Sequence, residues 1–194
     1  MTTKIRLATL NDAQAIQAIY APIVQNTVIS FETDVPGVEE MRARIQEKLA
    51  HFPWLVLEKD DALLGYVYAG TFRPRKAYQW SVEVTAYVHE NARRMGVGRA
   101  LYTSLFAILK EMGYYNAYAG ITLPNPGSVG LHEAMGFTPV GVYKSVGYKF
   151  GAWYDVGWWQ LRFRDDEGIP LSPKGLNDVP YNEGMQVGLS YLKI

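Results

Sequence analysis

The sequence contains no cysteine, and its charged residues leave no net charge. Without cysteine, a disulfide framework, a thiolate metal site and a cysteine nucleophile are all excluded. The three histidines are scattered without ligand spacing, so we expect no metal site. The 19 Lys and Arg balance 19 Asp and Glu, giving a formal net charge of zero. A neutral chain lacks the broad basic face that phosphate backbones require, so we expect no nucleic-acid partner.

Long apolar runs are also missing. The opening residues, Met1 to Arg6, lack an apolar signal core, and no run of about 20 apolar residues occurs. We therefore expect neither secretion nor membrane insertion, and take a cytoplasmic protein as the working expectation. The chain has 194 residues, 48% hydrophobic and 20% charged. That composition is typical of one folded domain with a substantial core.

Hydrophobic periodicity alternates between the periods of strand and helix. Strands are predicted near 5–7 and at 54–58, 63–69, 80–88 and 117–123, with a long hairpin at 140–163. Helices are predicted at 15–23, 38–49, 101–112 and 128–135. This order predicts an α/β (α+β) fold with a single mixed, mostly antiparallel sheet flanked by about four helices. Residues 1–163 would form this domain, and residues 164–194, rich in Gly and Pro, an extension that packs on the domain or on a dimer partner.

The segment between the predicted strand 80–88 and the helix after it is the most informative. Gly96 and Gly98 allow a sharp turn, and the helix that follows presents unpaired N–H groups. Arg93, Arg94 and Arg99 add local positive charge. Such a place can hold a phosphate, although glycines and solvated arginines also occur in ordinary strand-to-helix connections.

These residues carry a family resemblance. The run Arg93-Arg94-Met95-Gly96-Val97-Gly98 resembles the Arg/Gln-x-x-Gly-x-Gly signature of the GNAT superfamily of acetyl-CoA-dependent N-acetyltransferases. Segments at 29–32, 75–80, 82–88, 123–125, 147–149 and 153–157 are similar to the phosphinothricin and methionine sulfoximine acetyltransferase group. The resemblance runs from about residue 4 to residue 163. It implies the GNAT fold, a homodimer, and acetyl-CoA held by Tyr87, Val88, Arg93, Arg94, Met95, Gly96, Val97, Gly98, Arg99, Asn125 and Ser128.

Acetyl transfer to an amine requires a base, because an ammonium ion has no lone pair to attack a thioester. Glu83 is the candidate, since it lies in the middle of a strand beside aromatic residues that could raise its pKa. The alternative is a carboxylate that faces solvent or pairs with an arginine. His132 occupies the place where GNAT enzymes commonly carry a tyrosine acid, and it is either that acid or a structural hydrogen-bonding residue. Without cysteine, we expect direct attack and no acetyl-enzyme.

The acceptor is expected to be a small amino acid bearing a phosphinate, sulfoximine or sulfone group. Acceptor contacts are expected from Phe31, Glu32, Arg73, Arg75, Tyr78 and Thr85, of which Arg75 and Tyr78 coincide with the motif of the phosphinothricin and methionine sulfoximine acetyltransferase group. For Arg73 and Lys76 the alternative is an ordinary solvated loop. Cations at 73, 75 and 76 suit an anionic acceptor. Two alternatives stay open: another amine, such as a polyamine, an aminoglycoside or a protein N-terminus, and a non-catalytic module that binds acyl-CoA.

Overall fold

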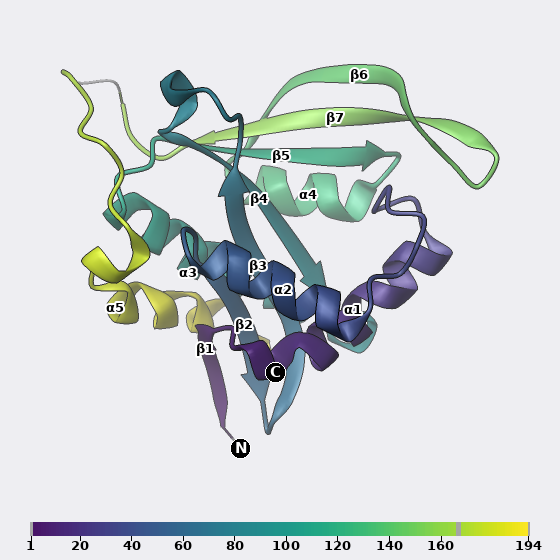
Figure 1. The fold of residues 1–194 in the computed structure, drawn as a ribbon, viewed down its shortest axis with the longest axis horizontal. Coiled ribbons are helices and arrows are strands. Elements are labelled where there is room, and N and C mark those ends of the chain that lie inside the picture. The colour runs from purple at the N-terminus through teal and green to yellow at the C-terminus, as the bar shows by residue number, and fades with distance from the viewer. Residues whose placement is uncertain (1, 166–167, 194) are drawn as a thin grey trace.

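One sheet, in the order β1-β2-β3-β4-β5-β7-β6, organises the chain (Figure 1). The computed structural model describes residues 2–165 and 168–193. Within these ranges the strands are β1 (Thr3–Leu7), β2 (Trp54–Lys59), β3 (Ala62–Thr71), β4 (Ser81–Val88), β5 (Asn116–Leu123), β6 (Thr138–Lys149) and β7 (Ala152–Arg162). Neighbouring strands are antiparallel except β4 and β5, which are parallel. The predicted mixed, mostly antiparallel sheet is confirmed.

Helices cover both faces of this sheet. They are α1 (Ala13–Asn26), α2 (Val38–Leu49), α3 (Val97–Glu111), α4 (Pro126–Ala134) and α5 (Tyr181–Gln186). The described ranges thus hold five α-helices rather than about four, because α5 forms in the segment whose sequence pattern is weak. None of these helices is long and apolar enough to cross a bilayer.

Strand β2 shows why both faces need a helical layer. Leu55 and Leu57 pack in the same core cluster as α3, whereas Trp54 and Val56 pack with α1 and α2. Successive side chains of a strand point to opposite faces, so an unbroken apolar run buries both. The tight turn into β3 uses Asp60 and Asp61 with positive φ angles of 46° and 66°, which suits the right-handed twist of a hairpin.

The sheet opens between β4 and β5. Their parallel pairing covers only Ser81 to Glu83, opposite Asn116 to Tyr118. Beyond Glu83, β4 continues to pair with β3 as far as Val88, and β5 continues to pair with β7 as far as Leu123. The second halves of the two strands therefore separate, and the separation lies directly before the glycine-containing loop.

Residues 168–193 pack on the same chain. Leu176, Val179 and Met185 join the core cluster of α3. The side-chain amide of Gln186 donates to the carbonyl of Ile5 at 2.6 Å and accepts from its N–H at 3.4 Å, at the open edge of β1. This segment therefore docks across α3 to the first strand, on the face opposite α1 and α2.

Candidate active site

The loop between β4 and α3 has the geometry of an anion site. Arg94 and Gly96 have positive φ angles of 62° and 84°, which turn the chain sharply into α3. The first hydrogen bond of the helix runs from the amide of Ala100 to the carbonyl of Gly96 at 2.8 Å. The amides of residues 97–99 precede it, so they are free of intrahelical partners and lie at the positive end of the helix dipole.

A cavity of about 800 Å³ lies against this loop and reaches the separation between β4 and β5. Of the residues expected to hold acetyl-CoA, those that line it are Tyr87, Val88, Arg93, Arg94, Gly96, Val97, Gly98, Arg99, Asn125 and Ser128. Met95 does not line the cavity. Its side chain packs on the core instead, so a contact of Met95 with acetyl-CoA stays a prediction. The volume lies in the range of about 300–1,000 Å³ typical of ligand sites, and the lining fits a long anionic cosubstrate.

One backbone amide of β4 points into the separation between the strands. The amide of His89 donates to the carbonyl of Leu64 on β3 at 2.9 Å. Because amide direction alternates along a strand, the N–H of Val88 points the other way, toward β5. The parallel pairing with β5 has already ended at Glu83, so this donor faces the cavity that Val88 lines.

Glu83 lies on the same face of β4 as Thr85 and Tyr87. Burial raises the pKa of Glu83, while the nearby charges of Arg73 and Lys48 partly oppose that rise. Within residues 2–165 and 168–193, its carboxylate makes no hydrogen bond or ion pair, so its oxygens are free to accept a proton. It does not line the cavity of the loop, which begins three residues farther along the strand.

His132 is buried, with 5% of its surface exposed, and both of its ring nitrogens have partners. Nδ1 lies 2.8 Å from the carbonyl oxygen of Ser128, so it carries the hydrogen of that bond. Nε2 lies 2.9 Å from the hydroxyl of Tyr102 and, in this neutral tautomer, accepts from it. Burial lowers the pKa of His132, although the Ser128 carbonyl opposes the shift. The arrangement favours the structural alternative for His132 over the acid role.

The loop between α1 and α2 carries Phe31 and Glu32 and is anchored from the hairpin of β6 and β7. The ammonium of Lys149 donates to the carbonyls of Val24 at 2.7 Å and Ser30 at 2.8 Å. The ring of Phe31 packs directly against Gly147, because a Cβ on Gly147 would lie 2.2 Å from the nearest atom of that ring. Figure 1 shows the hairpin extending above the end of α1. The hairpin therefore fixes the position of this loop.

Glu32 is held by its neighbours rather than free. It accepts from both terminal nitrogens of Arg44, at 2.7 and 3.0 Å, and from the hydroxyl of Tyr20 at 3.0 Å. Burial alone would raise the pKa of Glu32, but the bonds from Arg44 and Tyr20 bring it below its ordinary value. Glu32 is therefore an ionised anchor of the loop.

The other expected acceptor residues lie on an open surface. Arg73 packs its guanidinium over Phe72, 4.8 Å from the ring centre, and its charge acts on Glu83. Arg75 and Tyr78 are exposed in the loop after β3, and Thr85 is half-buried on β4, opposite Tyr68 of β3. None of these four, nor Phe31 or Glu32, lines a described cavity. Of these residues the structure shows Arg73 close enough for its charge to act on Glu83, and the acceptor contacts of the others stay predictions.

Several residues escaped the sequence analysis. Lys48, on α2, brings a cation close to Glu83, and it packs above Gly70, the residue paired with Glu83 across β3 and β4. Tyr102 supplies the partner of His132. Residues 190–193 line the cavity beside the loop. The helical periodicity of 38–49 could have indicated which face carries Lys48, but no local pattern marked residues 190–193.

Comparisons with known proteins agree with this geometry. The sequence profile of the family described as Acetyltransferase (GNAT) domain matches residues 5–158. The phosphinothricin N-acetyltransferase of Streptomyces viridochromogenes is 38% identical over 91% of this chain and 94% of its own length. The L-methionine sulfoximine/L-methionine sulfone acetyltransferase of Salmonella typhimurium is 31% identical over 86% and 97%. A crystal structure of a GNAT superfamily phosphinothricin acetyltransferase from Sinorhizobium meliloti in complex with AcCoA superimposes with a TM-score of 0.79, at 34% identity, over 84% of this chain and 89% of that one.

Proposed function

The chain belongs to the GNAT family of acetyltransferases, and from that premise we propose that it acetylates the α-amino group of phosphinothricin, methionine sulfoximine or methionine sulfone, or of a close analogue. Such an activity would detoxify these compounds. Acetyl-CoA is the acetyl donor. One observation carries the proposal: Glu83, which makes no described hydrogen bond or ion pair and whose pKa burial raises, lies where β4 leaves β5, and the strand then leads into a loop whose three arginines line a cavity.

The reaction is direct transfer. Glu83 takes a proton from the ammonium of the acceptor, directly or through a water molecule, and the free amine attacks the thioester carbonyl carbon. A C–N bond forms, and the negative charge that develops on the carbonyl oxygen faces the N–H of Val88. The C–S bond then breaks, the nitrogen loses its second proton, and the departing thiolate of coenzyme A takes up a proton. The amide product carries the acetyl group.

The loop and its helix hold the donor. The amides of residues 97–99 and the guanidinium groups of Arg93, Arg94 and Arg99 would bind the diphosphate. Asn125 and Ser128, at the start of α4, would border the pantetheine arm, since both line the part of the cavity beside the open end of β5. The thioester would then lie next to Val88, with Glu83 behind it on the same strand.

Cations near Glu83 suit an acceptor with a carboxylate and a second group whose oxygens accept hydrogen bonds. Arg73, Arg75 and Lys48 would bind its carboxylate and its phosphinate, sulfone or sulfoximine head. Phe31, Tyr78 and Thr85 would border the carbon chain, and Glu32 would keep the loop in place through Arg44. In this proposal His132 is a positioning residue, because both of its nitrogens are engaged.

We also propose that two copies form a homodimer. The acceptor residues lie open in one copy, and the hairpin beside them exposes seven large apolar side chains: Val140, Val142, Tyr143, Val146, Tyr148, Phe150 and Trp153. A second subunit would cover this surface and close the acceptor pocket. In this proposal residues 1–163 form the catalytic domain and residues 164–194 form its extension. The protein would act in the cytoplasm, where acetyl-CoA is available.

A panel of acceptors tests the proposed function. Release of coenzyme A thiol is measured with acetyl-CoA and each of phosphinothricin, methionine sulfoximine, methionine sulfone, spermidine and an aminoglycoside. We expect release with the amino-acid analogues and little with the two polycations. Release with spermidine alone would assign a cationic acceptor. Tight acetyl-CoA binding with no release for any amine would indicate a binding module and refute the proposed transfer.

A further inference from the structure

Residues 187–193, which follow α5, pack on α3 in a fixed position. The amide of Gly188 donates to the hydroxyl of Ser104 at 3.1 Å. A Cβ on Gly188 would lie 1.9 Å from the carbonyl oxygen of Ala100, so only glycine permits this approach. One turn earlier, Gly184 also packs on α3, where a Cβ on it would lie 3.3 Å from the Cβ of Ala107. The segment is therefore fixed to the helix whose N-terminus forms the expected phosphate site.

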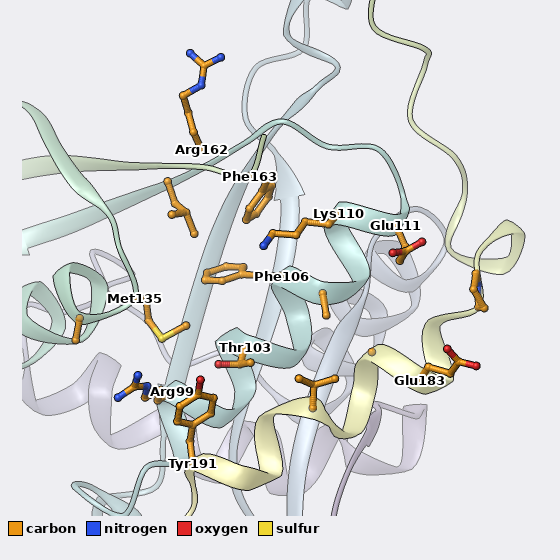
Figure 2. Close-up of a pocket in the computed structure, with 16 residues that line it drawn as sticks. Arg99, Thr103, Phe106, Lys110, Glu111, Met135, Arg162, Phe163, Glu183 and Tyr191 are labelled. Atoms are coloured by element: carbon orange, nitrogen blue, oxygen red, sulfur yellow. The ribbon is translucent and has the colours of Figure 1, made fainter. Parts of the chain in front are cut away.

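The same segment contacts the loop itself. The amide of Lys193 donates to the carbonyl of Met95 at 3.0 Å. A Cβ on Gly96 would lie 2.1 Å from the carbonyl oxygen of Tyr191. The ring of Tyr191 lies beneath the guanidinium of Arg99, 4.3 Å away, and Figure 2 shows the two side by side at the start of α3. Figure 2 looks into a second cavity, of about 770 Å³, and this pair lines both cavities.

The acetyl-CoA cavity is positively charged beside the loop and residues 190–193. Its lining includes Arg93, Arg94, Arg99 and Lys193, and no Asp or Glu is among the described residues that form it. The amides at the start of α3 and the arginines beside them suffice for one diphosphate. Coenzyme A carries a third phosphate, on the 3′ oxygen of its ribose, and Lys193 is a further cation of this lining, held next to the loop by the bond from its amide to the carbonyl of Met95.

We propose that residues 190–193 form the nucleotide end of the acetyl-CoA site and that the ammonium of Lys193 pairs with the 3′-phosphate of the ribose. The inference rests on the proposed function, since it requires coenzyme A as the ligand. Tyr191 holds Arg99 at the start of α3, and the backbone of residues 191–193 keeps the loop in its phosphate-binding shape. This segment lies outside the region that matches the GNAT profile, which ends at residue 158.

Two charge-removing variants of the full chain test the proposal. Lys193→Met removes the ammonium but keeps the side-chain length. Lys174→Met, an exposed lysine in the same extension that lines none of the described cavities, is the matched control. Dissociation constants for coenzyme A and for 3′-dephospho-coenzyme A are measured by isothermal titration calorimetry, and thermal unfolding confirms that each variant is folded.

We expect Lys193→Met to weaken coenzyme A binding about threefold to fivefold, the size typical of an exposed charge pair, and to leave 3′-dephospho-coenzyme A unchanged. The control should bind both ligands as the wild type does. Unchanged coenzyme A binding in Lys193→Met, or equal weakening for both ligands, would overturn the assignment of Lys193 while the proposed function stands. If the wild type itself binds no coenzyme A, the proposed function fails and the inference with it.

Discussion

Replacing Lys149 by methionine removes a buried ammonium that joins the β6–β7 hairpin to the loop between α1 and α2. Only 4% of the residue is exposed, and its two bonds go to the carbonyls of Val24 and Ser30. A hydrogen bond that involves a charged group contributes about 1.5–3 kcal/mol. Because methionine also avoids the cost of burying a charge, we expect a net loss of about 2–4 kcal/mol in the free energy of unfolding.

The loss is measured by thermal and urea unfolding. For a chain of this size, 1 kcal/mol corresponds to about 2–4 °C in Tm, so a loss of about 2–4 kcal/mol should lower Tm by about 4–16 °C. The loop that carries Phe31 and Glu32 also loses its anchor. We therefore expect the KM for the acceptor to rise more than the KM for acetyl-CoA, whose phosphate loop stands on α3.

Lys144→Met is the matched control on the same strand. Lys144 is exposed and pairs with Asp155 at 2.8 Å, an arrangement worth at most about 1 kcal/mol. If the Tm of Lys149→Met equalled that of the control and lay within about 2 °C of the wild type, the argument that the bonds from Lys149 to the two carbonyls hold the loop would be wrong. A drop in Tm with an unchanged acceptor KM would refute the link between the anchor and the acceptor site.

Three further outcomes are expected. Glu83→Gln should lower kcat by about 10²-fold or more and abolish the acidic limb of the kcat/KM profile. That limb arises because Glu83 must be ionised to accept a proton, and burial, which raises the pKa of Glu83, moves the limb to higher pH. A retained limb would exclude Glu83 as the base. His132→Asn should lower stability yet keep the alkaline limb, whereas loss of that limb would restore the acid role. Gly96→Ala should weaken acetyl-CoA binding and lower Tm by forcing φ of 84° on alanine and displacing Tyr191, and an unchanged Kd would contradict the loop assignment.

The features that could be predicted from the sequence are local ones. Alternation along 80–88 placed Glu83 on one face with Thr85, because side-chain direction in a strand depends only on position along the chain. The glycines at 96 and 98 indicated the loop because a positive φ, such as that of Gly96, favours glycine at that position whatever the rest of the chain does. Secondary-structure order then sufficed for the sheet.

What could not be predicted depends on contacts between distant parts of the chain. The acceptors of Lys149 lie 119 and 125 residues away, and Tyr102 is 30 residues from His132. Nothing in the neighbourhood of either residue encodes those partners. Residues 187–193 show no hydrophobic period. Gly188 is required there because it packs against α3, although a glycine in the sequence by itself suggests only a turn.

The two margins of the sheet differ in how they resist unwanted strand addition. At β1, the side chain of Gln186 occupies the N–H and C=O of Ile5, so an incoming strand finds those groups taken. At β6, no such cover is described; instead the pairing with β7 shifts register between Pro139 and Gly141 and again between Tyr143 and Gly147. Because these shifts interrupt the regular spacing of backbone N–H and C=O groups along β6, a strand of another molecule cannot form a long run of hydrogen bonds with it. A single chain should therefore resist fibrillar aggregation through the register shifts of β6 at one edge of the sheet and through Gln186 at the other.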